Sequence, residues 1–399
     1  MAEFTFLKKE KSREEDENFR SYNSQVRRHR FLVATRIITI SVIIIIAIVA
    51  FYVSYENKQY TEYEIITEEE RSDSEAAEYI PYNGNVIKYS QDGAEAFQGN
   101  NTAIWNETFE MQNPLIATCE NYAALGDFKG NKIYVVNSEG DSGEIDTKLP
   151  VSTFCVSRQG VVAAVLEDDN ETKINIYSAE GVQLAAIKCT MTQSGYPIDV
   201  ALSNDGQKLG VSYVRIEDGQ LKSSVAFYNF GEVGQNETDN YVSGYDYVDA
   251  VVPRIKFIND STAFGLGDNR FVIYKGSQKP VSIAETFLNE EVRSVFYGKD
   301  RVGLVFYNMG LDNKYRMDIY NDKGELESSL PFDIEYTDIV FKDDMIIIYN
   351  ERECTIYRAN GNIKYTGNFI DPVLLLVPTE NKTKYILVNR DGVQTIRLR

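Results

Sequence analysis

The chain contains a single histidine, His29, among its 399 residues. A Ser-His-Asp or Cys-His catalytic site needs an imidazole to carry a proton, so no such site can exist beyond residue 36. A zinc site that contains histidine is excluded from the same region. The chain also lacks a Gly-rich phosphate loop ending in GK[ST], a CxxCH haem motif and an HExxH motif. We therefore expect a protein that is not an enzyme, with no catalytic, cofactor or metal residues to assign.

Cysteine is also scarce. The four cysteines show no CxxC or metal-ligand spacing, and three of them fall in predicted strands; they are Cys119, Cys155, Cys189 and Cys354. Buried free thiols are the favoured interpretation, with disulfides as the alternative if the domain lies outside the cell.

Positive charge is scarce beyond the N-terminus. Residues 1–36 carry nine Lys or Arg and six Asp or Glu, whereas the rest of the chain carries 32 basic and 54 acidic residues. A domain this acidic is repelled by nucleic acid. We therefore expect no nucleic-acid partner.

One apolar run lies near the N-terminus. Ile37–Val53 contains no charged residue, and with Phe31–Thr35 ahead of it the apolar span reaches the ~20 residues that a bilayer requires. A cleaved signal peptide is the alternative, but the run is long for one and no small-x-small cleavage site follows. The cluster Arg27-Arg28-His29-Arg30 precedes the run and acidic residues follow it, which predicts a cytoplasmic N-terminus.

These features predict four parts. Residues 1–30 form a cytoplasmic tail, 31–53 a transmembrane helix, 54–80 an acidic spacer and 81–399 an extracytoplasmic domain. The spacer carries nine acidic and two basic residues, which should keep it extended. The protein is predicted to cross the cell membrane once, with Ile37–Val53 in contact with the lipid bilayer and the C-terminal domain outside the cell.

A short phrase recurs in the C-terminal domain: apolar, any residue, apolar, Tyr, then a turn with Gly. It is clearest at Ile174–Tyr177 with Gly181. Other copies end at Tyr228, Tyr274, Tyr320 and Tyr357, and weaker copies end at Tyr89, Val136 and Asn389. The average step of about 43 residues suits four short strands per unit and is typical of a β-propeller. The repeated Tyr are interpreted as packing residues of buried strands.

The fold class predicted from these units is all-β, a seven-bladed β-propeller preceded by the transmembrane helix. The last unit is short by one strand, so the ring is expected to close by pairing residues 85–110 with residues 372–399, which would remove the exposed sheet edges. Eight blades is the alternative, in which the weak copy near Tyr89 builds its own blade with Ile104-Trp105.

Recognition is predicted to lie on the loops between the strands. Long loops on a rigid ring that carry Tyr and Asp make a plausible binding face. The predicted binding residues are Tyr196, Tyr241, Tyr245, Asp246, Tyr247 and Asp249. The acidic stretch 167–171 is a weaker candidate for Ca²⁺, which prefers oxygen ligands, but it matches no known calcium loop and a plain acidic turn is favoured.

Four segments carry a family resemblance: Tyr89–Gly93 with Ile104-Trp105-Asn106, Ser194–Ile198, Ser203–Leu209 with Ser212-Tyr213, and Val225–Gly231 with Val233-Gly234-Gln235. Together with the N-terminal anchor and acidic spacer, they resemble an uncharacterised family of membrane-anchored WD40-like and PQQ-like propeller proteins of Gram-positive bacteria. The resemblance covers residues 37–399 and implies the propeller fold and the membrane topology. It carries no catalytic residues over to this chain.

The favoured function is a membrane-tethered extracytoplasmic propeller that acts as a non-enzymatic scaffold for a protein partner or an envelope ligand. The alternative is a carbohydrate-active enzyme of the envelope that uses paired carboxylates at the channel mouth. Two carboxylates about 5–10 Å apart would favour that enzyme. A quinone-cofactor propeller would show repeated Trp residues, and the chain has only Trp105.

Overall fold

The computed structural model describes residues 27–51, 54, 57–70, 77–168, 171–191, 194–217, 219–308 and 312–399. The chain divides into two compact units, Met1–Gln59 and Tyr60–Arg399. Most of the predicted cytoplasmic tail lies outside the described residues. In the first unit, one helix spans Arg27–Phe51 with its side chains exposed. Its length of 25 residues and its apolar composition suffice to cross a membrane.

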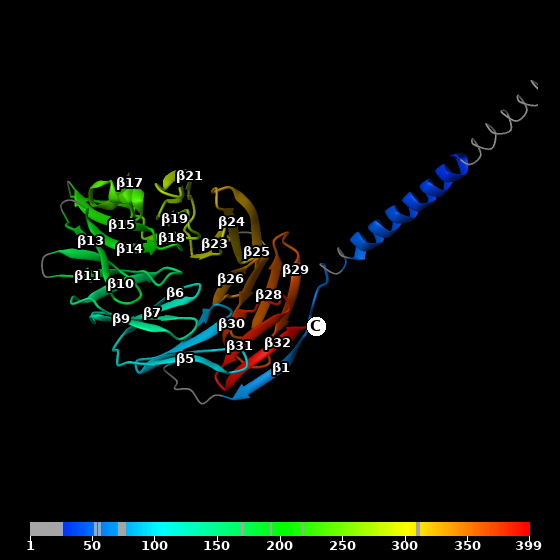
Figure 1. Ribbon diagram of the computed structural model, residues 1–399, viewed down its shortest axis with the longest axis horizontal. Coiled ribbons are helices and arrows are strands. Elements are labelled where there is room, and N and C mark those ends of the chain that lie inside the picture. The colour runs from blue at the N-terminus through cyan, green and yellow to red at the C-terminus, as the bar shows by residue number, and fades with distance from the viewer. Residues whose placement is uncertain are drawn as a thin grey trace, which may run out of the picture. The chain divides into compact units, whose positions relative to one another are not determined.

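The second unit is an eight-bladed β-propeller. Among the described residues, its strands form eight antiparallel four-stranded sheets arranged in a ring (Figure 1). Neighbouring sheets touch through their first strands, as β10 touches β14 and β14 touches β18, so the first strand of each blade is the innermost one. The prediction of seven blades is therefore wrong, and the alternative of eight is confirmed.

Blades 1 to 4 contain β2 (Glu78–Tyr82), β3 (Asn85–Tyr89), β4 (Gly93–Phe97), β5 (Ala103–Thr108); β6 (Pro114–Cys119), β7 (Tyr122–Asp127), β8 (Lys132–Asn137), β9 (Ser142–Asp146); β10 (Val151–Val156), β11 (Val162–Glu167), β12 (Thr172–Tyr177), β13 (Gln183–Cys189); and β14 (Tyr196–Leu202), β15 (Lys208–Glu217), β16 (Gln220–Asn229), β17 (Tyr241–Tyr247). A short helix α2 (Glu232–Gln235) and a 3-10 turn η1 (Thr238–Asn240) connect the last two strands of blade 4.

Blades 5 to 8 contain β18 (Arg254–Phe257), β19 (Thr262–Leu266), β20 (Arg270–Lys275), β21 (Val281–Phe287); β22 (Ser294–Tyr297), β23 (Arg301–Tyr307), β24 (Tyr315–Asn321), β25 (Leu326–Phe332); β26 (Asp338–Lys342), β27 (Met345–Tyr349), β28 (Glu353–Arg358), β29 (Ile363–Asn368); and β30 (Val373–Pro378), β31 (Lys384–Asn389), β32 (Gly392–Leu398) with β1 (Tyr63–Glu70).

The ring closes through β1, which is the outermost strand of blade 8. β1 pairs antiparallel with β32 from Tyr63↔Leu398 to Glu70↔Gly392, and Figure 1 shows the two strands side by side. The expected pairing of residues 85–110 with 372–399 is wrong. Those N-terminal residues form β3–β5 of blade 1, and their side chains Val86 and Phe97 pack against the face of blade 8 instead.

The prediction that residues 54–80 form an extended acidic spacer is corrected, because this range contains β1 and the start of β2. β1 has a polar sequence, YEIITEEE, because an outermost strand turns most of its side chains to water. Charged residues on such an edge also discourage pairing with other chains. The polar strand still gains specific contacts, since Gln394 Nε2 donates a hydrogen bond to Glu68 Oε1 at 2.7 Å.

The five clear copies of the Tyr phrase lie on the third strand of their blades. Tyr177, Tyr228, Tyr274 and Tyr320 are buried and Tyr357 is half-buried, so these rings pack between blades as expected. In each case the pairing with the fourth strand shifts register at the Tyr. Such a bulge increases the local twist, which helps the outer strand follow the propeller shape.

We predict that removing β1 opens the ring. A protein that starts at Ala77 loses the fourth strand of blade 8 and exposes the edge of β32, so it should unfold at a lower temperature and aggregate. For a domain of this size each kcal/mol lost lowers Tm by about 1–2 °C. Thermal unfolding followed by circular dichroism measures the change. A matched protein that starts at Asn57 keeps β1; if both unfold at the same temperature, β1 does not close the ring.

Candidate functional site

Blade 4 differs from the other blades in its long central hairpin. β15 and β16 have ten residues each and pair from Lys208↔Asn229 to Glu217↔Gln220. The inner strand β14 begins opposite Val214, so the end of the hairpin extends beyond it. Ile216 on this extension has 68% of its surface exposed. The hairpin therefore projects an apolar side chain into solvent.

A hollow of about 950 Å³ lies beside the hairpin. Its lining combines aromatic, charged and apolar side chains from four segments of the chain. They include Met191 and Ser194 between β13 and β14; Tyr213, Arg215, Ile216 and Glu217 of β15; Ser224 and Tyr228 of β16; and Tyr241, Tyr245 and Asp246 of β17. Its volume is in the range of ligand sites, about 300–1,000 Å³.

The charged residues in and beside the hollow form ion pairs in which the carboxylates are exposed and the cations are half-buried. Arg215 Nη2 lies 3.1 Å from Asp246 Oδ1, and Arg215 Nε lies 3.3 Å from Glu217 Oε2. Lys222 Nζ lies 3.2 Å from the same Glu217 oxygen. Hydrogen bonds from Lys222 and then Arg215 hold the pKa of Glu217 below its usual value. Exposed pairs of this kind contribute about 0–1 kcal/mol, so they are readily exchanged for pairs with a partner.

The floor of the hollow is held by buried tyrosines. The Tyr213 and Tyr228 hydroxyl oxygens are 2.9 Å apart, and the Cys189 thiol lies 3.7 Å from the Tyr213 hydroxyl. Burial raises the pKa of Tyr228 to about 12, so this phenol stays neutral. Tyr241 meets Tyr228 edge to face at 6.0 Å between ring centroids, and 47% of its surface is exposed. The hollow therefore has an aromatic floor in which one ring, that of Tyr241, is accessible to solvent.

Three of the six predicted binding residues, Tyr241, Tyr245 and Asp246, line this hollow. The other three serve different contacts in the structure. Tyr247 is buried with its hydroxyl 2.5 Å from that of Tyr274, and Asp249 Oδ1 lies 2.6 Å from Arg270 Nη2. Tyr196 is half-buried at the start of β14 and is not in the lining.

The predicted binding residues between 241 and 247 were expected to lie on a loop, but they belong to β17, the outer strand of blade 4. The sequence analysis did not identify Arg215, Ile216 and Glu217, because only the pairing with β16 shows that β15 continues as far as Glu217. The unusual length of the apolar and charged run before Gly219 could have indicated this long strand.

A second hollow of about 560 Å³ occupies the centre of the ring, lined by the inner strands of six blades. Asp199 is the one carboxylate in this lining among the residues that the structure describes. Its Oδ2 accepts a hydrogen bond from the Ile255 N–H at 2.9 Å. Burial raises the pKa of Asp199 in spite of that bond. The described lining thus contains no carboxylate pair of the kind that the glycosidase alternative requires.

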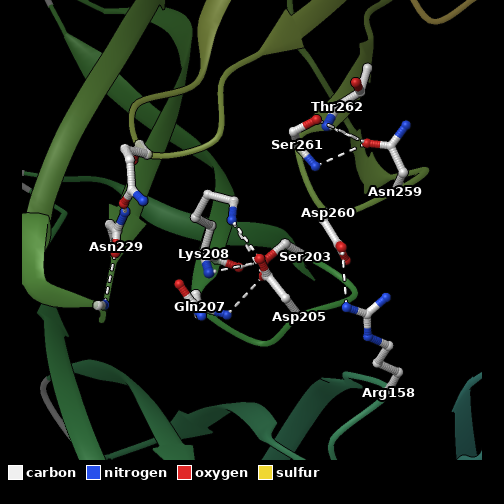
Figure 2. A network of polar contacts seen from close by, with 12 residues as sticks. Arg158, Ser203, Asp205, Gln207, Lys208, Asn229, Asn259, Asp260, Ser261 and Thr262 are labelled. Carbon is white, nitrogen blue, oxygen red and sulfur yellow. Dashed lines mark hydrogen bonds and ion pairs between the residues drawn. The ribbon is translucent and has the colours of Figure 1, made fainter.

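The turns after the inner strands converge at one end of this channel. Arg158 Nη2 in blade 3 donates to Asp260 Oδ2 in blade 5 at 3.1 Å, so it joins two blades that are not neighbours (Figure 2). In the turn of blade 4, Lys208 is 1% exposed and its Nζ lies 3.0 Å from Asp205 Oδ2. This buried pair belongs to the segment Ser203–Leu209, so that part of the family resemblance reflects turn structure.

The weaker calcium candidate at 167–171 falls partly on Asp169 and Asn170, which lie outside the described residues. Of the neighbours that are described, Asp168 Oδ2 and Glu171 Oε1 lie 2.7 and 3.2 Å from Lys173 Nζ. A lysine thus already satisfies two of the carboxylates. The described part of the chain contains no cluster of three or more His, Cys, Asp or Glu side chains placed to hold a metal ion.

Solved structures with a similar fold share little sequence with this chain. Sqt1 from Chaetomium thermophilum has a TM-score of 0.53 at 11% identity, covering 85% of this chain and 100% of that one. A eukaryotic initiation factor gives 0.51 at 14% identity, covering 86% and 89%. AztD from Citrobacter koseri gives 0.50 at 8% identity, covering 74% and 87%. Identities this low support the fold alone.

No curated protein matches the chain. A family of unknown function, DUF5711, matches residues 56–398, a range that contains every strand of the propeller. The expected resemblance to an uncharacterised propeller family is confirmed to that extent, while the bacterial source and the membrane anchor stay predictions. The chain is a member of the family of unknown function DUF5711.

Proposed function

We propose that this protein is a membrane-tethered extracytoplasmic propeller that binds a protein partner or an envelope ligand and has no enzymatic activity. The observation that carries the proposal is the hollow of blade 4, which lies beside the extended hairpin and is lined by three of the predicted binding residues. The rigid ring supplies a fixed base, and the hairpin supplies exposed apolar and charged side chains on it.

The helix Arg27–Phe51 supports the tether. Its apolar side chains are exposed along its whole length, as expected for contact with lipid rather than with a protein core. Arg27, Arg28, Arg30 and Arg36 lie in its N-terminal part, which favours a cytoplasmic N-terminus. The acidic propeller then lies outside the cell, where it is kept away from the anionic inner leaflet.

The composition of the hollow supports binding of another macromolecule. Met191, Ile216 and Tyr241 are exposed apolar or aromatic side chains in one lining, and monomeric proteins rarely gather such groups without a use. Tyr and Arg are enriched among the residues that dominate interface energies. The exchangeable pair between Arg215 and Asp246 offers both signs of charge to a partner.

Chemical considerations support a role without catalysis. The single histidine lies in the N-terminal helix, far along the chain from the propeller. Glu217 and Asp246, the carboxylates that line the hollow of blade 4, are both engaged by Arg215. Asp199 is the one carboxylate among the described residues that line the central channel.

The topology makes a first prediction. A cysteine introduced at the exposed hairpin tip, Gln220→Cys, should react with a membrane-impermeant maleimide in intact cells. The native thiols give little background, because Cys155, Cys189 and Cys354 are buried and Cys119 is half-buried. Ser12→Cys serves as the control and should react only after lysis. Labelling of Ser12→Cys, but not Gln220→Cys, in intact cells would contradict the proposed orientation.

The recognition surface makes a second prediction. A photo-reactive amino acid in place of Ile216 should cross-link the protein to a discrete neighbour in native membranes. The matched control is Ile283 on the outer strand of blade 5, which has a similar apolar side chain with 45% exposure. Tyr241→Ala should weaken the adduct at residue 216 about tenfold or more, as for an aromatic residue that contributes 1.4 kcal/mol. Equal adducts at residues 216 and 283 would show that blade 4 has no special role.

A further inference from the structure

The central channel contains two cationic side chains on one strand. β18 alternates in burial, so Ile255 and Phe257 pack in the core while Arg254 and Lys256 line the channel. Residues i and i+2 of a strand lie on the same face. The two cations are therefore stacked along the channel wall.

Neither cation has a hydrogen bond or an ion pair with any residue that the structure describes. Lys256 Nζ lies 5.7 Å from the centre of the Tyr297 ring, which is a cation–π contact. Burial opposes the charge on Lys256, yet the pKa of its ammonium is raised, and Asp199 is the carboxylate among the groups that raise it. Most other buried or half-buried cations of this propeller are paired, as Lys208 and Arg270 are.

Asp199 is the other charged group of the channel lining, and its single negative charge leaves the lining with a net positive charge. Asp199 lies close enough to Arg254 and Lys256 for their charges to lower its pKa, although burial raises it more. Its two oxygens accept the N–H groups of Val200 and Ile255 at 3.0 and 2.9 Å. The carboxylate is therefore oriented by the backbone. Arg254 and Lys256 together exceed its charge within a domain that is strongly acidic elsewhere.

Arg254 is exposed, whereas Lys256 is half-buried deeper in the channel. Arg254 begins β18, and Lys256 lies two residues closer to the turn that contains Asp260. That turn end is bridged by the Arg158–Asp260 ion pair at 3.1 Å and by the Asn204–Glu120 hydrogen bond at 3.4 Å. A ligand that enters from the opposite end meets Arg254 first and Lys256 further in.

We propose that the channel binds a small molecule that carries a phosphate or carboxylate group, held between Arg254 and Lys256. The hollow of about 560 Å³ fits a metabolite-sized solute rather than a polymer or a protein segment. Two charge-assisted contacts to one anionic group give strong hydrogen bonds in a partly desolvated site. Thr118 and Thr153 in the same lining provide hydroxyl groups for the rest of the ligand. This site is separate from the hollow of blade 4 and does not depend on it.

The test measures anion binding to the full chain in detergent micelles. Isothermal titration with orthophosphate and with citrate, each against chloride at equal ionic strength, should detect saturable binding of at least one of them. Binding of orthophosphate alone assigns a phosphate ligand, and binding of citrate alone assigns a carboxylate ligand. Absence of saturable binding by both anions would overturn the proposal.

Variants locate the site. Lys256→Met keeps the length of the side chain and should weaken binding about tenfold to a hundredfold, the range for loss of one charged hydrogen-bond partner. Arg254→Gln is an exposed substitution that should fold and should also weaken binding. Lys148→Met removes an exposed cation outside the channel and should leave the affinity unchanged. Equal affinity for the wild type, Lys256→Met and Arg254→Gln would overturn the proposal.

A purely structural role for Lys256 has a different signature. If Lys256 served only to stabilise the fold, Lys256→Met would lower Tm without any anion present. The proposal expects Tm without anion to stay the same or to rise, because removal of a half-buried charge that has no ion pair with any described residue relieves a desolvation cost. It also expects orthophosphate or citrate to raise Tm of the wild type but not of Lys256→Met.

Discussion

The pairing of β1 with β32 is the contact on which the rest of the structure depends. A propeller is stable because every sheet packs on two neighbours, and this requires the first and last blades to meet. Here the N-terminal strand completes the last blade, so the two ends of the propeller chain are joined by main-chain hydrogen bonds from Tyr63 to Glu70. Both proposed binding sites rely on this closure. The channel exists only inside a complete ring, and the hollow of blade 4 needs a fixed base.

Blade 4 and the channel show how a regular ring acquires specific surfaces. The ring itself is built from buried apolar strands whose repeated Tyr fill the space between blades. Departures from that plan carry the candidate functions. One departure is the ten-residue hairpin with Arg215 and Ile216, and the other is the pair of cations on β18 that line the channel. Each departure places groups where packing alone does not require them.

Much of the fold was predictable from the sequence, because the Tyr phrase marks the third strand of most blades by a simple repeat. The number of blades was not predictable in this way, because it depends on whether Glu78–Tyr82 and Tyr63–Glu70 form strands. Those strands are short or polar, and their strand character comes from pairing with β3 and β32 rather than from their own composition. An edge strand needs few apolar residues, so a spacer and an edge strand can share one composition.

The candidate site was predictable in part for a related reason. Tyr241, Tyr245 and Asp246 stood out as aromatic and acidic residues in a region without the repeat. Their grouping with Arg215 and Met191 arises only when β15 and β17 are brought to either side of β16. Tyr247 and Asp249 looked equivalent in the sequence, but they lie at the end of β17 and just beyond it, where they meet Tyr274 and Arg270 of blade 5.

The role of β1 as the closing strand is tested most directly by amide hydrogen exchange on the intact protein. The account predicts that the amides of Tyr63–Glu70 that pair with β32 exchange as slowly as those of β32 itself, because both are released only when the ring opens. Rapid exchange across Tyr63–Glu70, with slow exchange retained in β30–β32, would show that the ring closes without β1 and would contradict the account.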